Sequence, residues 1–351
     1  MKKRVMVIPG DGIGPEVIEQ GVRVLKLACD KFGHSLEFTW KDWGANKWLK
    51  EGVALPQDGL AEILEHDAVY FGAIGDPRIP DSAHAREILL GMRFGLDLYA
   101  NVRPLKLQLP ELGILKRPAD INIVIIRENT EDSYVALGGN FKRNSMDEVS
   151  IDESIHTRKG VERIVRYAFE YAKNHGLSLV TLGDKSNAIG FGGSLWQRVF
   201  KLVAMEYPLI KAEHRFVDVL AMEMVVSPEK FQVIVASNLF GDILSDIGAG
   251  LIGGLGLAAS ANIHPGKVGL FEPVHGSAPN IAGKNEANPI AAMLSASMML
   301  NFLNMPQPAQ LLQDAVKSSL QEKICTKDLH GNCSTVEVGN FVEDFIKKSM
   351  C

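Results

Sequence analysis

The amino-acid sequence predicts an α/β protein. Short apolar runs that suit buried strands occur at residues 4–8, 68–73, 121–126, 177–182 and 231–236. Each run is followed by a segment with Gly or Asn and charged residues, and usually then by a helix. This order is typical of parallel or mixed sheets that carry polar chemistry at the carboxyl ends of their strands. At about 100 to 200 residues per domain, the length of 351 residues predicts two domains.

Local signals predict the elements in order along the chain. The first strand leads into a glycine turn at residues 10–14, and a proline then stands at the first position of a helix. Residues 157–175 have apolar positions at helical spacing, and Gly176 supplies a C-terminal stop. Residues 138–152 are polar and lack helical periodicity, so they predict an excursion such as an arm.

Composition excludes several classes of protein. The chain has 37 basic and 42 acidic residues, and this net charge of −5 provides no basic surface for nucleic acid. The 4 cysteines are scattered and form no C-x-x-C pair, so they predict thiols rather than a disulfide framework. Two uncharged stretches, 247–263 and 290–300, are broken by glycines or too short to span a bilayer. We therefore expect a cytoplasmic protein without membrane or nucleic-acid partners.

The glycine turn, Gly10-Asp11-Gly12-Ile13-Gly14, is a first candidate site. Glycines at a helix N-terminus let the backbone approach a phosphate. The spacing, however, is G-x-G-x-G followed by proline, not the G-x-G-x-x-G of a dinucleotide fingerprint. A ligand-binding loop and a tight strand-to-helix turn both remain open.

Three arginines, Arg93, Arg103 and Arg127, lie in or next to apolar segments. Arg127 follows directly on a predicted strand, where α/β sheets bind their ligands. Because guanidinium groups bind carboxylates and phosphates with two hydrogen bonds, converging arginines indicate a polyanionic substrate. The alternative for each arginine is an ordinary ion pair with a neighbour such as Glu128 or Glu131.

A pair of aspartates, Asp242 and Asp246, follows the last apolar run at a spacing of i and i+4. This spacing places both carboxylates on one face of a helix, where like charges repel. A bound cation would relieve that repulsion, and hard oxygen ligands favour Mg2+ or Mn2+ over zinc. A solvated acidic face is the alternative.

Two further side chains are candidates for proton transfer. Lys185 comes immediately after a predicted strand and is a candidate general base, and Tyr134 is a candidate proton donor. The alternatives are a solvated lysine and a tyrosine packed in the core. Residues 272–284, which include His275, are rich in Gly, Pro and small polar residues and predict a structured loop that could hold a ligand.

Together these segments resemble the β-decarboxylating dehydrogenases, the family of 3-isopropylmalate, isocitrate, homoisocitrate and tartrate/D-malate dehydrogenases. The resemblance runs from residue 9 to about residue 335, and the motif at 238–246 and the loop at 275–279 are its most specific parts. It implies the isopropylmalate/isocitrate dehydrogenase-like fold, with two α/β domains on a shared mixed sheet, and not a Rossmann fold.

The resemblance also implies how the domains divide the chain. A discontinuous cofactor-binding domain would comprise residues 1–99 plus 253–351, and a substrate and dimerisation domain residues 100–252. The second domain would contribute an arm near 138–152 to a homodimer whose active sites are shared across the interface.

Site roles follow from the resemblance at matching positions. The implied catalytic residues are Tyr134 and Lys185, and the implied substrate-binding residues are Leu89, Leu90, Arg93, Arg103 and Arg127. The implied metal ligands for Mg2+ or Mn2+ are Asp218, Asp242 and Asp246, with Lys185 and Asp218 reaching the partner's site. The implied cofactor-binding residues are Ile13, Asn187, Glu272, His275, Gly276, Ser277, Ala278, Asn280 and Asn288.

The implied reaction is the metal-dependent oxidative decarboxylation of a 3-substituted malate by NAD. Isocitrate enzymes have Ser and Asn where this chain has Glu87 and Leu89, whereas Leu89 and Leu90 match the apolar pair that receives an isopropyl group. We therefore expect conversion of 3-isopropylmalate to 4-methyl-2-oxopentanoate, as in leucine biosynthesis. At Asn280 the chain lacks the cationic pair that binds the 2′-phosphate of NADP, which favours NAD.

Other functions remain as alternatives. Residues 127–131, Arg-Glu-Asn-Thr-Glu, resemble the homoisocitrate, NAD-isocitrate and tartrate branches of the family. The Pro-Asp pair at 80–81 resembles the tartrate/D-malate enzymes. Outside the family, the alternatives are a metabolite- or nucleotide-binding protein without catalysis and a Mg2+-dependent phosphotransferase. The first would have lost Lys185, Tyr134 or an aspartate ligand, and the second would need a Walker lysine or an Asp-x-Asp motif.

Overall fold

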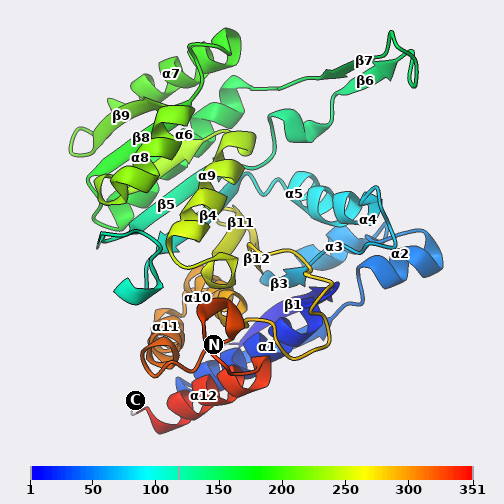
Figure 1. Cartoon of the computed structure of the whole chain (residues 1–351), viewed down its shortest axis with the longest axis vertical. Coiled ribbons are helices and arrows are strands. Elements are labelled where there is room, and N and C mark those ends of the chain that lie inside the picture. Colours follow the sequence, from blue (N-terminus) through cyan, green and yellow to red (C-terminus); the bar gives the residue numbers. More distant parts are fainter. Residues whose placement is uncertain (1, 118, 350–351) are drawn as a thin grey trace. The chain divides into compact units, whose positions relative to one another are not determined.

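The computed structural model describes residues 2–117 and 119–349, and the chain divides into two compact units. Unit 1 comprises Met1–Leu98, Lys106–Pro118 and Ala249–Cys351, and unit 2 comprises Tyr99–Leu105 and Ala119–Gly248. Each unit has its own strands and its own covering helices (Figure 1).

The sheet of unit 1 has the strand order β2-β1-β3-β12-β11. The strands are β1 (Lys2–Gly10), β2 (Ser35–Trp40), β3 (Ala68–Ala73), β11 (Ala259–His264) and β12 (Val268–Pro273). The pairs β1–β2, β1–β3 and β3–β12 are parallel, whereas β11 and β12 are antiparallel, so the sheet is mixed. All six residues of β3 are buried, as expected for a central strand covered on both faces.

Three longer helices of unit 1 contact α1 (Gly14–Lys31): α10 (Ile290–Phe302), α11 (Pro306–Gln321) and α12 (Thr335–Lys348). α10 also packs on β11 and β12 and is almost entirely apolar, because it is buried on most sides. A capping box between Ser334 and Glu337 begins α12. The shorter helices are α2 (Ala45–Glu51), α3 (Gly59–Leu64), η2 (Pro110–Leu112), η5 (Leu255–Leu257) and η6 (Lys327–Leu329).

A continuous helical stretch of unit 1 changes its winding part-way. It consists of α4 (Ala83–Ala85), the π-helix η1 (Arg86–Leu90) and α5 (Gly91–Gly95). Ile88 and Met92 from this stretch are fully buried in a core cluster that includes Trp43 and Phe71. A π-helical turn is rare and often marks a functional site, and this one carries Leu89 and Leu90.

The sheet of unit 2 has the strand order β4-β5-β10-β8-β9. The strands are β4 (Ala100–Lys106), β5 (Asn122–Glu128), β8 (Leu179–Asp184), β9 (Lys211–Phe216) and β10 (Val233–Ala236). The pairs β5–β10, β10–β8 and β8–β9 are parallel, and β10 is buried along its whole length. The strands β5 and β10 therefore end at the same edge of the sheet, where polar residues follow them.

The helices of unit 2 are α6 (Arg158–Asn174), α7 (Gly190–Ala204), α8 (Val217–Val226), α9 (Asn238–Leu251), η3 (Ser133–Val135) and η4 (Pro228–Lys230). α6 packs on β5, β8 and β10 through the apolar face that its spacing predicts. Its N-cap, Thr157, accepts a hydrogen bond from the backbone N–H of Gly160.

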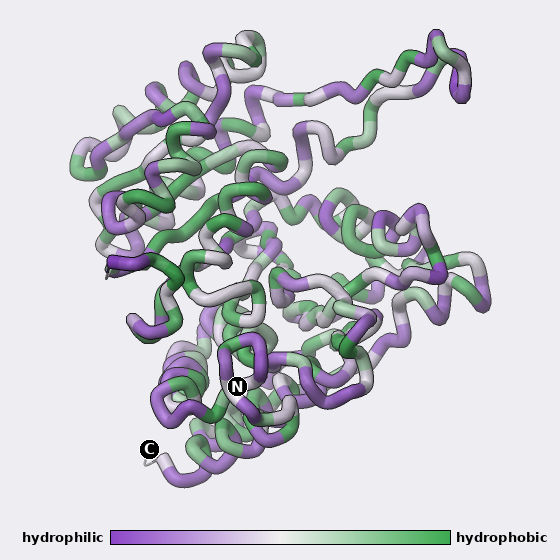
Figure 2. The backbone as a smooth tube through the Cα atoms, viewed as in Figure 1, coloured by the Kyte–Doolittle hydropathy of each residue, from purple (hydrophilic) through white to green (hydrophobic). Residues whose placement is uncertain are grey.

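A two-stranded antiparallel hairpin, β6 (Gly138–Phe141) and β7 (Val149–Asp152), projects from the rest of unit 2 (Figure 1). All of its strand residues are exposed. Figure 2 shows hydrophobic and hydrophilic residues mixed along it. The exposed apolar side chains include Phe141 and Ile151, which a hairpin in water has little reason to carry unless another surface covers them.

The predicted α/β class with a mixed sheet is confirmed, and each of the five apolar runs overlaps a strand. The loop expected at residues 272–284 starts later than predicted: Glu272 and Pro273 belong to the end of β12, because they pair with β11. Cys29, Cys325 and Cys333 are free thiols, and Cys351 lies outside the described residues. In the described part of the chain, no helix is both long and apolar enough to cross a membrane.

Candidate active site

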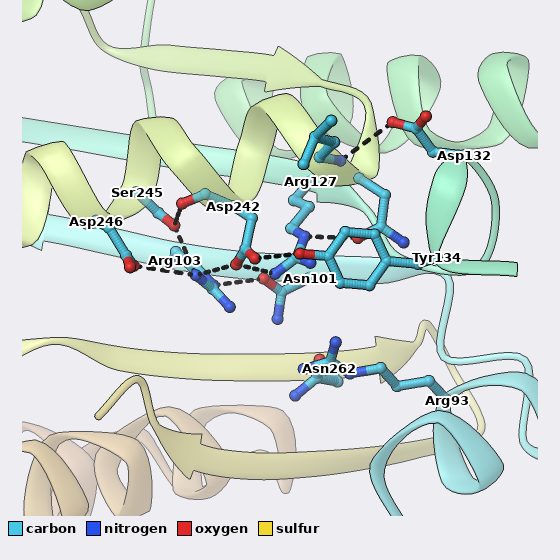
Figure 3. Close-up of polar contacts among 12 residues, drawn as sticks. Arg93, Asn101, Arg103, Arg127, Asp132, Tyr134, Asp242, Ser245, Asp246 and Asn262 are labelled. Atoms are coloured by element: carbon cyan, nitrogen blue, oxygen red, sulfur yellow. Dashed lines mark hydrogen bonds and ion pairs between the residues drawn. The ribbon is translucent and has the colours of Figure 1, made fainter. Parts of the chain in front are cut away.

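Asp242 is the centre of a polar cluster in unit 2 (Figure 3). It lies one turn into α9, which starts where β10 ends. Its carboxylate accepts hydrogen bonds from Arg127 Nη1 at 2.5 Å and from the Tyr134 hydroxyl at 2.5 Å. Arg103 Nη1 lies 3.1 Å from the same carboxylate. Three of the predicted site residues therefore converge on a fourth.

Both arginines of this cluster are buried and held by other side chains. Arg103 donates through Nε to Asn101 Oδ1 at 2.8 Å and through Nη1 to Ser245 Oγ at 2.6 Å. Arg127 donates through Nε to Asn238 Oδ1 at 2.9 Å. These bonds orient the guanidinium groups before any ligand arrives, which reduces the entropy lost on binding.

Asp246 lies one turn further along α9, with its carboxylate 3.8 Å from Arg103 and its side chain 61% exposed. Partial burial raises the pKa of Asp246; the positive charge of Arg103 opposes this rise, and the negative charge of Asp242 adds to it. Two carboxylates on one helix face are the hard oxygen donors that suit a divalent cation. Within residues 2–117 and 119–349, no three His, Cys, Asp or Glu side chains gather around one metal position.

The third predicted ligand, Asp218, lies on α8 and pairs with Lys185. The distance from Lys185 Nζ to Asp218 Oδ1 is 2.7 Å. The hydrogen bond from Lys185 lowers the pKa of Asp218 below its usual range. The structure therefore joins two residues that the sequence assigned to the partner's site, while Asn187 lies exposed in the turn that follows.

Asp132 is a buried residue of this region that the sequence analysis missed. Although burial alone would raise the pKa of its carboxyl, hydrogen bonds from Ser154 and Ser237 hold that pKa below the usual range. Its Oδ2 accepts the backbone N–H of Leu239 at 3.1 Å. Asp132 thus ties the segment that carries Tyr134 to the start of α9. Its place two positions before the candidate tyrosine was the only sequence signal that could have marked Asp132 as a site residue.

In unit 1, Arg93 pairs with Glu272 at the end of β12. The distance from Arg93 Nη2 to Glu272 Oε1 is 3.3 Å, and both side chains are 9% exposed. Asn262 donates to the same oxygen at 2.7 Å, and Figure 3 shows Arg93 pointing toward Asn262. Glu272, which the resemblance places among the cofactor residues, contacts a predicted substrate arginine here.

The predicted substrate pair, Leu89 and Leu90, is half-buried on η1, and Leu89 packs against the core cluster. Glu87, two positions before Leu89, accepts the backbone N–H groups of Ala54 and Leu55, each at 2.9 Å. Its carboxylate therefore anchors the π-helix to a neighbouring loop. Arg86 is exposed.

The glycine turn contacts the predicted cofactor loop. The backbone N–H of Ile13 donates to the carbonyl of Ser277 at 2.8 Å. Gly12 has a φ of +55°, and a Cβ there would lie 2.0 Å from the same carbonyl oxygen, so only glycine fits. This close approach is why a tight turn at residue 12 requires glycine. The hydrogen bond from the turn also holds the predicted cofactor loop.

A cavity of about 410 Å3 lies beside this turn. Its lining comprises Ile13, Gly256, His275, Ile281, Glu286, Asn288, Lys327 and Asp328. Among the described residues, Nε2 of His275 is buried without a hydrogen-bond partner, and burial lowers the pKa of this histidine. A concave pocket with an unsatisfied polar atom suits a nucleotide. Gly276, Ala278 and Asn280 are exposed, and Ser277 is buried.

Comparison with known proteins agrees with this geometry. The family model "Isocitrate/isopropylmalate dehydrogenase" matches residues 4–344. The chain belongs to this family. It is 41% identical to 3-isopropylmalate dehydrogenase of Thermobifida fusca (strain YX) over 96% of each chain, and 41% identical to decarboxylating D-malate dehydrogenase of Escherichia coli (strain K12) over 97% of each. A crystal structure of isocitrate dehydrogenase from Methylococcus capsulatus matches 99% of this chain and 100% of its own, with a TM-score of 0.90 and 36% identity.

The resemblance to the isocitrate/isopropylmalate dehydrogenase family is therefore confirmed, and the chain is a decarboxylating-dehydrogenase-type protein. Among the predicted site residues, the structure forms one group around Asp242, one pair at Lys185 and Asp218, and one group around the cavity of unit 1. The polar residues that support these groups were missed, chiefly Asn101, Asp132 and Asn262. Asn101 could have been found, because residues two apart on a strand share a face.

Proposed function

We propose that the chain catalyses the NAD- and divalent-metal-dependent oxidative decarboxylation of a 3-substituted malate, with 3-isopropylmalate as substrate and 4-methyl-2-oxopentanoate as product. The observation that carries this proposal is the convergence of Arg103, Arg127 and Tyr134 on Asp242. It combines carboxylate-binding cations, a proton donor and a metal-type carboxylate in one cluster. Family membership and the 3-isopropylmalate relative support it.

The donor set of α9 fits a divalent cation. Asp242 and Asp246 would provide two carboxylates, and Asp218 of a second copy would provide the third. When bound, Mg2+ or Mn2+ would stabilise negative charge on the substrate's oxygens, and NAD would accept the hydride from its C2.

The side chains of this chain would bind the substrate and move its protons. Arg103 and Arg127 would hold substrate carboxylates through paired hydrogen bonds. Arg93 is proposed as a further substrate-binding arginine because it matches one in the family resemblance. Lys185 of a second copy, which lies beside Asp218 of that copy, would accept the proton of the C2 hydroxyl as a general base. After CO2 leaves, Tyr134 would donate a proton to C3, the carbon from which CO2 departed. Its hydroxyl is already oriented by the hydrogen bond to Asp242.

The cavity of unit 1 fits the cofactor. Its lining presents the unsatisfied Nε2 of His275, which a nucleotide could satisfy. Asn280 is exposed on the adjacent loop, and an amide there can bind a ribose diol but offers no charge to a 2′-phosphate. We therefore propose NAD rather than NADP, with unit 1 as the cofactor-binding domain and unit 2 as the substrate and dimerisation domain.

Exposed apolar side chains on two helices of unit 2 support a homodimer. Val219, Met222, Val225 and Val226 of α8 and Leu239 and Ile243 of α9 are between 37% and 59% exposed. Patches of this kind mark protein interfaces. Lys185 and Asp218 lie beside this surface, which supports active sites shared between two copies. A cytoplasmic location and a place in leucine biosynthesis remain predictions.

D-malate or tartrate is the second candidate substrate, and homoisocitrate is the third. The decarboxylating D-malate dehydrogenase of Escherichia coli is as similar to this chain as the 3-isopropylmalate enzyme is, at 41% identity. The Pro-Asp pair at residues 80–81 resembles the tartrate/D-malate enzymes, and the Arg-Glu-Asn-Thr-Glu segment at residues 127–131 resembles the homoisocitrate, NAD-isocitrate and tartrate branches.

A steady-state rate panel tests the proposal. Purified protein with Mn2+ should reduce NAD on 3-isopropylmalate with a higher kcat/KM than on D-malate, tartrate or homoisocitrate, and the rate should vanish with excess chelator. A higher kcat/KM on D-malate or tartrate would reassign the substrate within the family. Binding of NAD without turnover on any of the four acids would support the non-catalytic alternative.

A further inference from the structure

A buried pair in unit 1, Asp11 and His84, has no role in the proposed reaction. Asp11 Oδ1 accepts the backbone N–H of Ala45 at 2.7 Å, and Oδ2 accepts that of Gly75 at 2.9 Å. His84 Nε2 lies 3.1 Å from the same Oδ2. His84 is 0% exposed and Asp11 is 7% exposed. Burying a carboxylate costs free energy unless it is hydrogen-bonded, so these contacts stabilise Asp11 in its buried position.

The pair joins two functional parts of the unit. Asp11 stands in the glycine turn, whose Ile13 N–H bonds the carbonyl of Ser277 in the predicted cofactor loop. His84 stands at the start of residues 83–95, here called the specificity segment, which carries Leu89, Leu90 and Arg93. Asp11 is therefore hydrogen-bonded directly to the specificity segment and is linked through the glycine turn to the predicted cofactor loop.

Close packing leaves the Asp11 carboxylate little freedom. A Cβ on Gly44 would lie 2.6 Å from Asp11 Oδ1, so the backbone approaches the carboxylate where only glycine is tolerated. The backbone N–H of Asp11 also donates to the carbonyl of Ala73 at 2.8 Å. The carboxylate that pairs with His84 is therefore itself held by the surrounding backbone.

The specificity segment needs such anchors because its π-helix is an unfavourable winding. Within the segment, Ile88 and Met92 are buried in the core cluster, and Glu87 accepts hydrogen bonds from the backbone of Ala54 and Leu55. On its N-terminal side, His84 is the buried polar anchor. Loss of this anchor would let the winding shift and would move Leu89 and Leu90.

We propose that Asp11 and His84 form a positioning pair that sets the specificity segment relative to the glycine turn and so determines selection for a 3-alkyl group on malate. The inference rests on the proposed function. The pair touches no reacting atom and acts through Leu89 and Leu90.

The substrate selectivity of two histidine variants tests the proposal. His84→Leu removes the donor to Asp11, whereas the amide of His84→Gln can reach the same oxygen. Because a hydrogen bond to a buried charge is lost, His84→Leu should lower the ratio of kcat/KM on 3-isopropylmalate to that on D-malate by about tenfold. His84→Gln should restore the ratio to within about twofold of the unmodified protein. The ratio does not depend on the fraction of folded enzyme.

A matched control is His66→Leu. His66 is a half-buried histidine of the same unit, bonded to Thr39 and to the carbonyl of Glu62, and it joins neither functional part. Its loss should leave the ratio unchanged. An equal loss of kcat/KM on both substrates in His84→Leu would show a purely structural role and would overturn the proposal.

Hydrogen–deuterium exchange separates this inference from the proposed function, because it needs no turnover. In His84→Leu, the backbone amides of residues 10–14 and 83–95 should both exchange faster than in His84→Gln, with residues 119–248 unchanged. Faster exchange in 83–95 alone would show that the pair does not link the two parts, which would overturn the inference. Failure of the unmodified protein to oxidise either acid would instead reject the proposed function.

Discussion

Arg127–Asp242 in unit 2 and Arg93–Glu272 in unit 1 are both arginine–carboxylate pairs, but their surroundings differ. The closest distance is 2.5 Å in the first pair and 3.3 Å in the second. The Asp242 side chain is 33% exposed, whereas that of Glu272 is 9% exposed and also accepts a bond from Asn262. One carboxylate is open on one side, and the other is enclosed.

This difference in exposure indicates two different roles for an arginine–carboxylate pair. Asp242 lies on a helix face with Asp246 one turn away, so its open side can meet a cation. Glu272 ends a buried strand, and its bonds hold Arg93 and Asn262 in place. Exposure and the neighbouring carboxylate, and not the arginine contact, distinguish the carboxylate proposed as a metal ligand from the carboxylate that is enclosed by its hydrogen-bond partners.

The largest expected effect separates the two carboxylates directly. Asp242→Asn should lower kcat with Mn2+ by roughly 100- to 1,000-fold, the cost of removing one preorganised charged group from an active site. Glu272→Gln should mainly raise the KM for the substrate, because the change weakens the contact that holds Arg93 but leaves Arg93 in place. Initial rates over ranges of substrate and Mn2+ concentrations measure kcat and KM for each variant, with circular dichroism to verify folding. Equal losses of kcat in the two variants would erase the distinction.

The arginines should differ in the same direction, with a smaller effect. Arg127→Lys loses the planar fork that bonds both Asn238 and Asp242, so KM for the substrate should rise by about tenfold or more. Arg93→Lys should raise KM less, because its fork makes the longer contact to Glu272. The pair of KM values is the measurement, and Arg198→Lys on α7 is the control. A larger rise in KM for Arg93→Lys than for Arg127→Lys would contradict the prediction that the Arg127–Asp242 pair contributes more to substrate binding.

Glu128, next to Arg127, extends the comparison to a more deeply buried acid, 1% exposed. Burial raises its pKa to about 7, against the effect of hydrogen bonds from Thr130 and Glu131. The folded state therefore holds the proton of Glu128 to a higher pH than the unfolded state does. The protonated side chain contributes fully to the stability of the fold below the ordinary glutamate pKa of about 4.3, and this contribution is lost as the pH rises toward 7.

Glu128→Gln should therefore flatten the pH dependence of stability. Between pH 5 and 7.5, the free energy of unfolding of the unmodified protein should fall by up to about 3 kcal/mol relative to that of the variant. Urea titrations at both pH values test this, with the exposed Glu153→Gln as control. Parallel losses in the unmodified protein and the Glu128 variant would show that Glu128 stays ionised.

Much of the molecule follows from local sequence. The apolar run at 68–73 coincides with β3, and the periodic stretch at 157–175 contains α6 with its predicted stop, because burial pattern and capping act over a few residues. Asp242 and Asp246 could be placed on one helix face by spacing alone. Motifs in order along the chain were enough to indicate the family.

What only the tertiary structure decided is which groups share a bond. Arg93 and Glu272 are 179 positions apart, and Asp11 and His84 are 73 apart, so no local pattern relates them. The packing of the strands of unit 1 brings such residues to one place, and burial then makes each contact necessary. The sequence by itself determined the elements, the family resemblance and the candidate residues. Tertiary packing decided whether each charge is open to a ligand or enclosed as a support, because solvent access is a property of the assembled fold.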